Sequence, residues 1–180
     1  VTSPVVSPKP PSDLPIWMLG SSADSAELAA QRGLPYNLGL FINPEADNRL
    51  IKLYKQDFQT NGDTSKPHAM ITIGVFCAET EEAAKAQQLA FDVNFYRYVT
   101  GQRSGPNGGR LLTPEEAQLY PMTPQLEGFI SSRSQNRAVG DPEQVRREVA
   151  LIAKIYGADE VMAVSNMYYF EDRKRSFELL

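Results

Sequence analysis

The chain has 180 residues, enough for one domain with its own hydrophobic core, and its 18 Lys and Arg against 22 Asp and Glu give a net charge of −4. Apolar residues make up 42% and charged residues 22%, which excludes a disordered chain, and the mild acidity argues against nucleic-acid and anionic-membrane surfaces. The single cysteine, Cys77, and the single histidine allow neither an internal disulfide nor a Cys/His zinc set. We therefore expect no metal site and a reducing, cytoplasmic compartment. No apolar run reaches the roughly 18 residues of a membrane span.

Residues 1–14 are a proline-rich lead-in with prolines at positions 4, 8, 10 and 11, which favour an extended backbone. The segment has no continuous apolar region of the kind that signal peptides carry. It begins at Val1 and not at Met, which suggests a fragment, a processed chain or a missing upstream part. We assign residues 15–180 to one α/β domain.

Short apolar runs alternate with amphipathic stretches after the lead-in. The runs cover residues 16–19, 38–42, 69–78 and 161–164. None alternates cleanly between polar and apolar residues, a pattern typical of strands that are buried on both faces. The runs predict four parallel strands.

Helix start and stop signals lie between these runs. The predicted helices are residues 22–32, a helix that starts at Asn43-Pro44-Glu45, a long helix between Thr80 and Gly101, a helix between Asp141 and Gly157, and residues 170–180. Two apolar stripes at helical spacing mark their inner faces: Leu50, Ile51, Tyr54 and Phe58, and then Val145, Val149, Ile152 and Ile155.

This alternation predicts parallel strands with right-handed crossovers and covering helices. Four strands are half of a (β/α)₈ TIM barrel, which needs roughly 200–250 residues or more. A half barrel has two open sheet edges. Three arrangements remain open: pairing with the missing half, closure by dimerisation, or a small open α/β sheet.

The first strand runs into a serine-rich turn, with Gly20, Ser21, Ser22 and Ser25 at the start of a helix. Free N–H groups, the positive helix end and serine hydroxyls suit a phosphate, and Gly20 allows close backbone approach. The alternative is ordinary capping, since Ser21 and Asp24 have the spacing of a capping box.

Residues 101–140 form a long insertion that is rich in glycine and proline and carries Arg103, Arg110 and Arg133. A helix of one or two turns is predicted to start at Thr113-Pro114. Inserts of this length are often lids or binding loops. A solvated connector with surface arginines is the alternative.

Three other residues favour structural roles. His68 precedes the third strand and is more often a surface residue than a catalyst in such a position, Cys77 fits an inert core thiol, and Trp17 fits the core or the lining of a barrel. The chain has no Walker loop, no GxGxxG after a strand and no plausible Ser/His/Asp set. Catalytic residues stay unassigned.

The chain resembles the C-terminal half of the luciferase-like monooxygenases, a flavin-dependent family, over essentially its whole length. PIWMLGSSADSAELAAQRGLPYNLGLFINPE is similar to the family's fifth strand, phosphate loop, helix and sixth strand, and MITIGVFCAETEEAAKAQQLA to the seventh strand and its helix. GQRSGPNGGRLLTPEEAQLYP matches the variable loop, VGDPEQVRREVALIAKIYGADEVMAV the helix before the eighth strand and that strand, and RKRSFELL the terminal helix.

This resemblance implies the C-terminal half of a TIM barrel that uses reduced FMN and O₂ to oxidise a small organic substrate. It implies Ser21, Ser22 and Ser25 as ligands of the FMN phosphate, with Gly20 allowing backbone approach. It also implies that residues 101–140 form a lid over the flavin, for which Arg103, Arg110 and Arg133 are candidate residues.

The first four barrel strands of the family are absent from these residues. The resemblance therefore implies a flavin-dependent monooxygenase if the N-terminal half is present, and not activity of this chain alone. The alternatives are a non-catalytic flavin- or phosphate-binding half barrel and a structural partner that completes a barrel with a separate N-terminal half. A homodimer and a flavin reductase are further partners that it allows. FMN and a deazaflavin are not distinguished.

Overall fold

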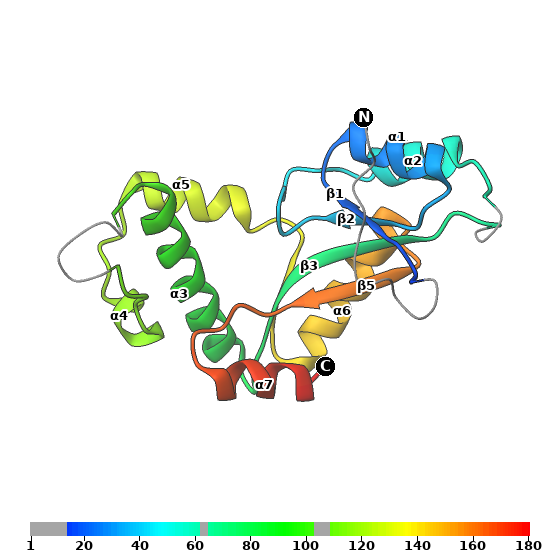
Figure 1. Cartoon of the computed structure of the whole chain (residues 1–180). Coiled ribbons are helices and arrows are strands. Elements are labelled where there is room, and N and C mark those ends of the chain that lie inside the picture. Colours follow the sequence, from blue (N-terminus) through cyan, green and yellow to red (C-terminus); the bar gives the residue numbers. More distant parts are fainter. Residues whose placement is uncertain (1–13, 62–64, 103–108) are drawn as a thin grey trace.

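A computed structural model describes residues 14–61, 65–102 and 109–180 (Figure 1). Their strands form one five-stranded parallel sheet. The strands are β1 (Met18–Gly20), β2 (Tyr36–Gly39), β3 (Ala69–Cys77), β4 (Arg137–Gly140) and β5 (Glu160–Val164). They are arranged in the order β1-β2-β3-β4, and β5 also pairs with β3. The α/β fold class is confirmed, while residues 1–13 of the proline-rich lead-in lie outside the described residues.

All four predicted strands exist, although two of them are shifted. β1 begins two residues later than its apolar run, and β2 ends at Gly39, before Phe41 and Ile42. The chain turns there because the N–H groups of Ile42 and Asn43 both donate to the carbonyl of Gly39. Phe41 and Ile42 are consequently exposed residues of a loop at the carboxyl end of the sheet.

Seven helices occur among the described residues. They are α1 (Ala23–Arg32), α2 (Arg49–Asp57), α3 (Glu81–Val99), α4 (Pro114–Gln118), α5 (Pro124–Arg133), α6 (Pro142–Tyr156) and α7 (Phe170–Glu178). Thr80 caps α3 and Asp141 caps α6 as predicted, and Gly157 ends α6 in the left-handed conformation, with φ 62°. Ile155 is exposed and Tyr156 takes the buried position at the end of the predicted stripe of α6.

The predicted start of α2 at Asn43-Pro44-Glu45 is wrong. Asn43 Oδ1 accepts a hydrogen bond from the Glu45 N–H, which closes a local turn, and the helix begins only at Arg49. Side-chain bonding of this kind competes with helix formation. The predicted apolar stripe of this helix is nevertheless correct, since Ile51 and Tyr54 are buried.

Residues 101–140 are more structured than the predicted long loop. The short helix predicted at Thr113-Pro114 is α4, but the segment also contains α5 and β4, so the sheet has one strand more than predicted. β4 pairs with the carboxyl half of β3, from Gly74 opposite Arg137 to Cys77 opposite Gly140. The insertion is therefore attached to the sheet by backbone hydrogen bonds.

Two hydrophobic clusters stabilise the fold. The larger one lies between the sheet and α1, α2 and α6, and the smaller one joins α3, α4 and α5 around Ala90, Val93, Ala117 and Leu126. Figure 1 shows α3, α4 and α5 together beyond the end of the sheet toward which β5 points. This is the carboxyl end of the strands, where parallel α/β folds carry their sites.

The two faces of the sheet differ. Met18, Ile71 and Ala163 belong to the larger cluster or pack against it. Side chains alternate along a strand, so the residues before and after each of them in its own strand point to the opposite face. On that face Thr72 Oγ1 donates to Asn37 Oδ1 at 2.8 Å, while Leu19 and Met162 are about half exposed, at 50% and 46%. β1 pairs only with β2 among the described residues, so its outer edge is open.

Candidate functional site

The serine-rich turn lies at the carboxyl end of β1 and opens α1. Ser22 is the N-cap, and its Oγ accepts from the Ser25 N–H at 3.4 Å, while Ser25 Oγ accepts from the Ser22 N–H at 3.3 Å. Ser25 Oγ also donates to the Ser22 carbonyl at 2.7 Å and lies 3.2 Å from the hydroxyl of Tyr36. The capping box thus pairs Ser22 with Ser25, and the predicted pairing of Ser21 with Asp24 is wrong.

Gly20 is required for this turn. A Cβ at position 20 would lie 2.1 Å from Ser25 Oγ and 2.2 Å from Ser25 Cβ. Two atoms cannot approach so closely, so any side chain at position 20 would displace Ser25. The group that approaches the backbone of Gly20 in the structure is Ser25, and the predicted approach of a phosphate to Gly20 stays a prediction.

The turn retains unused hydrogen-bond donors. Ala23 and Asp24 begin α1, so their N–H groups have no acceptor one turn earlier in the helix. The hydroxyl of Ser21 has no hydrogen-bond partner among the described residues, and the Ser21 carbonyl accepts from Asn43 Nδ2 at 3.4 Å. These N–H groups and this hydroxyl form a site that can accept an anion.

A cavity of about 40 Å³ lies next to the loop after β2, between Phe41, Gly74, Phe76, Arg133 and Arg137. Arg137 Nη1 donates to both carboxylate oxygens of Asp92 at 2.8 and 2.9 Å. Asp92 is fully buried, and burial raises its pKa while Arg137 opposes that rise. This buried ion pair connects α3 to β4.

Arg133 lies beside that ion pair. Its guanidinium stacks over the ring of Phe95 at 4.5 Å, and its Nη2 donates to the Phe41 carbonyl at 3.4 Å. Burial lowers the pKa of Arg133, and the charge of Arg137 adds to that effect. Arg133 Nε is buried without a hydrogen-bond partner in the described part of the chain.

The other two lid candidates lie apart from this cavity. Arg110 forms hydrogen bonds of 2.7 and 2.5 Å with the carboxylate of Glu116, and Glu116 in turn caps α4. Arg103 lies outside the described residues. Of the two described lid candidates, Arg133 is therefore the one that lies at the carboxyl end of the strands.

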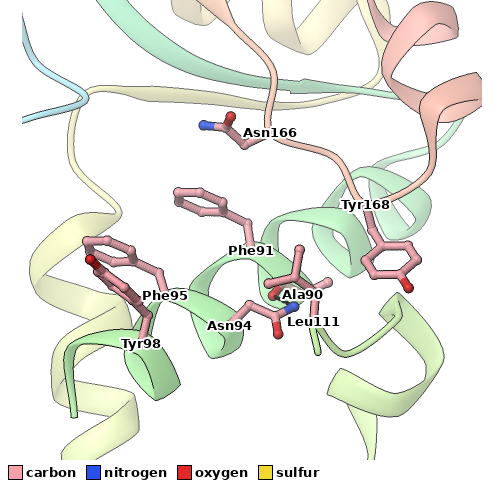
Figure 2. Close-up of a pocket in the computed structure, with 8 residues that line it drawn as sticks. All are labelled: Ala90, Phe91, Asn94, Phe95, Tyr98, Leu111, Asn166 and Tyr168. Atoms are coloured by element: carbon pink, nitrogen blue, oxygen red, sulfur yellow. Dashed lines mark hydrogen bonds between the residues drawn. The ribbon is translucent and has the colours of Figure 1, made fainter. Parts of the chain in front are cut away.

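A larger cavity of about 370 Å³, which sequence reasoning missed, lies between α3, the segment 109–112 and the chain after β5. Figure 2 shows the rings of Phe95 and Tyr98 side by side on α3, with Phe91 next to them below Asn166. The rings of Phe91 and Phe95 are parallel to within 2° at 6.0 Å. Aromatic residues at 91, 95 and 98 have helical spacing, a signal that the sequence offered.

His68 and Cys77 have structural surroundings. His68 lies at the amino end of β3, where its Nε2 is 3.1 Å from a carboxylate oxygen of Glu160 and its ring contacts Trp17 edge-on at 5.3 Å. Cys77 is buried, and burial raises the pKa of its thiol, which disfavours a nucleophilic role. No helix in the described ranges combines the length and apolar character that crossing a membrane requires.

Sequence comparison matches residues 1–159 to the family model of the luciferase-like monooxygenases. The protein YceB of Bacillus subtilis is 32% identical over 165 residues, and a luciferase-like monooxygenase of Escherichia coli K12 is 28% identical over 166 residues. Each alignment covers 92% of this chain and 48% of the relative. The chain therefore spans about half the length of the curated relatives it matches.

Comparison with solved structures gives the same family and the same half-length coverage. The crystal structure of apo-MsnO8 superposes with a TM-score of 0.81 at 31% identity and covers 97% of this chain and 52% of MsnO8. The FMN complex of the oxygenating constituent of 3,6-diketocamphane monooxygenase from Pseudomonas putida superposes with a TM-score of 0.60 at 21% identity, over 92% of this chain and 46% of that one. The second likeness supports the fold alone.

Proposed function

The chain belongs to the luciferase-like monooxygenase family, and from this membership we propose that it is the C-terminal half of an FMN-dependent monooxygenase. The proposed enzyme uses reduced flavin and O₂ to oxidise an organic substrate. The whole enzyme is a TIM barrel, of which this chain supplies the second half.

The observation that carries the proposal is the serine turn at the carboxyl end of β1. A phosphate dianion would accept hydrogen bonds from the N–H groups of Ala23 and Asp24 and from the Ser21 hydroxyl. Ser22 and Ser25 would hold the turn in shape through their capping box, and Gly20 would leave room for Ser25. The donor set and the positive end of the helix fit a phosphate.

The remaining residues at this end of the sheet would orient the flavin and limit access of water. The loop after β2 bonds to the serine turn through Asn43 and to Arg133 through Phe41. When bound, reduced FMN supplies the electrons for the oxidation, and the protein supplies orientation and shielding from solvent. Arg133 is the proposed lid residue, while Arg110 stabilises α4.

We propose that the N-terminal half of the barrel covers the open face and edge of the sheet. Leu19 and Met162 are half exposed on that face, and Ile16, two residues before the edge strand β1, is exposed. The half length relative to MsnO8 supports this partner over a homodimer. A non-catalytic binding half barrel is the alternative if no such half is present. A flavin reductase and a cytoplasmic location remain predictions.

Titration with FMN and with riboflavin tests the phosphate site, because riboflavin lacks the phosphate. Ser21→Ala is expected to weaken FMN binding about tenfold, the effect of losing one hydrogen bond to a charged group, and to leave riboflavin binding unchanged. The double variant Ser22→Ala with Ser25→Ala is expected to weaken FMN binding more than Ser21→Ala does, since the turn then loses its shape.

Thr123→Ala is the matched control, since it removes a similar N-cap from α5, which has the same length as α1. It should not change the affinity for FMN. Equal FMN affinity in the parent protein and in the serine variants would remove the turn from the site. The same titration with a deazaflavin decides between the two cofactors.

A further inference from the structure

The cavity on α3 differs in chemistry from the serine turn. Its walls come from Ala90, Phe91, Phe95 and Tyr98 on α3, from Leu111 in the segment before α4 and from Tyr168 after β5 (Figure 2). None of the residues that line it carries a formal charge at neutral pH. Its volume of about 370 Å³ is in the range of small-molecule sites, which are mostly apolar with a few polar groups.

The two asparagines of the cavity have different roles. Asn94 is saturated by the protein: its Nδ2 donates to the carbonyls of Ala90 and Leu112, and its Oδ1 accepts from the Leu112 N–H at 2.8 Å. Asn166 is exposed and has no hydrogen-bond partner in the part of the chain that the structure describes. Figure 2 shows Asn166 above Phe91, on the chain that follows β5. It can therefore bond to a polar group of a ligand.

The cavity adjoins the smaller cavity at the carboxyl end of the sheet. Phe91 and Asn166 line both this cavity and the smaller one beside Arg133. Phe41 lines the smaller cavity, and its loop bonds to the serine turn through Asn43. The larger cavity thus adjoins the same end of the strands that carries the proposed phosphate site.

We infer that this cavity is the substrate site and that the substrate is an uncharged, largely apolar molecule with one hydrogen-bonding group directed at Asn166. This inference rests on the proposed function, because it takes the serine turn as the flavin site. The walls supply aromatic and aliphatic contact, and no side chain of the lining would neutralise a buried ligand charge, which is costly to leave unpaired.

Two fluorescent probes test the chemical class. N-phenylnaphthylamine is uncharged, and anilinonaphthalene sulfonate has the same ring system with an added anionic group. The uncharged probe is expected to bind at least about tenfold more tightly, since the anion has no cation in the lining. Equal or tighter binding of the sulfonate would overturn the inference, as would a failure of the uncharged probe to bind.

Leu111→Glu locates the probe, and Leu151→Glu on the outer face of α6 is the matched control. Both leucines are exposed, at 43% and 58%, so neither change should prevent folding. Leu111→Glu is expected to weaken binding of N-phenylnaphthylamine about tenfold or more and to leave FMN binding intact, while Leu151→Glu changes neither. Equal effects of the two variants would refute the site. Probe binding without any FMN binding would instead refute the proposed function and leave the apolar pocket standing.

Discussion

The sheet with α1, α2 and α6 and the unit formed by α3, α4 and α5 are stabilised in different ways. The first has a large, continuous cluster of buried apolar residues on one face of the strands. The second has a small cluster centred on four buried apolar residues, and aromatic residues of α3 face a cavity. The two regions meet where β3 leads into α3 and where β4 pairs with β3.

The α3–α5 unit relies on specific polar contacts. Asn94 holds the segment before α4, Glu116 joins Arg110 to the α4 cap, and Asp92 binds Arg137 across the junction with the sheet. Net contributions of hydrogen bonds and exposed ion pairs are small compared with those of a large apolar core. We therefore expect this unit to open locally at a lower free energy than the sheet. A region of this kind can admit a substrate without unfolding the scaffold.

Core truncation gives the largest expected effect. Ile71→Ala in β3 is expected to lower the free energy of unfolding by about 4–5 kcal/mol, because Ile71 is fully buried in the larger cluster. The residues around it cannot move in to fill the space that the shorter side chain leaves. Leu126→Ala in α5 should cost only about 2 kcal/mol, since its smaller cluster can relax. Chemical denaturation measures both, and equal losses would break the contrast between the two regions.

Breaking the buried ion pair is expected to have the next largest effect. Arg137→Met leaves the Asp92 carboxylate buried without its partner and should cost about 3–4 kcal/mol. Hydrogen exchange should show protection lost in α3, α4 and α5 before α1 and α2. The double change Asp92→Leu with Arg137→Met removes both charges and should recover most of the stability. A single variant as stable as the parent would show that the pair does not hold the junction.

The smallest expected effect concerns Glu116. Arg110 and the Thr113 N–H lower the pKa of Glu116 to about 2. Because this pKa is depressed on folding, the stabilising contact is fully present above the ordinary glutamate pKa and is lost as the pH falls toward 2. NMR titration of the Glu116 carboxyl should give this value, and Arg110→Gln should raise it. Arg175→Gln, which breaks an ion pair elsewhere, should leave it unchanged.

The sequence predicted the elements whose signals are local. Buried strands of β-branched and apolar residues, N-caps at Thr80 and Asp141 and the left-handed glycine at 157 need only neighbouring residues to form, and all were found. β4 was missed because its four residues contain no apolar run and its existence depends on pairing with β3. α5 was missed although Thr123-Pro124 repeats the signal of Thr113-Pro114.

The serine turn was found because Gly20, Ser21, Ser22 and Ser25 are adjacent in sequence. The sequence could not show which two residues form the capping box, since Ser21 with Asp24 and Ser22 with Ser25 have the same spacing. In the structure the pair is Ser22 with Ser25, and Ser25 also contacts Gly20 and Tyr36. The larger cavity could not be assembled, because its walls come from residues 90–98, 111 and 166–168. The helical spacing of the aromatic residues 91, 95 and 98 on α3 was the sequence signal that could have indicated this cavity.

Trp17 is the chain's single tryptophan and directly precedes β1, where it is partly exposed and in edge-on contact with the ring of His68 before β3. An indole that loses water emits at shorter wavelength. The protein therefore contains its own optical reporter at the amino end of β1, and its emission wavelength registers whether another polypeptide covers this part of the sheet.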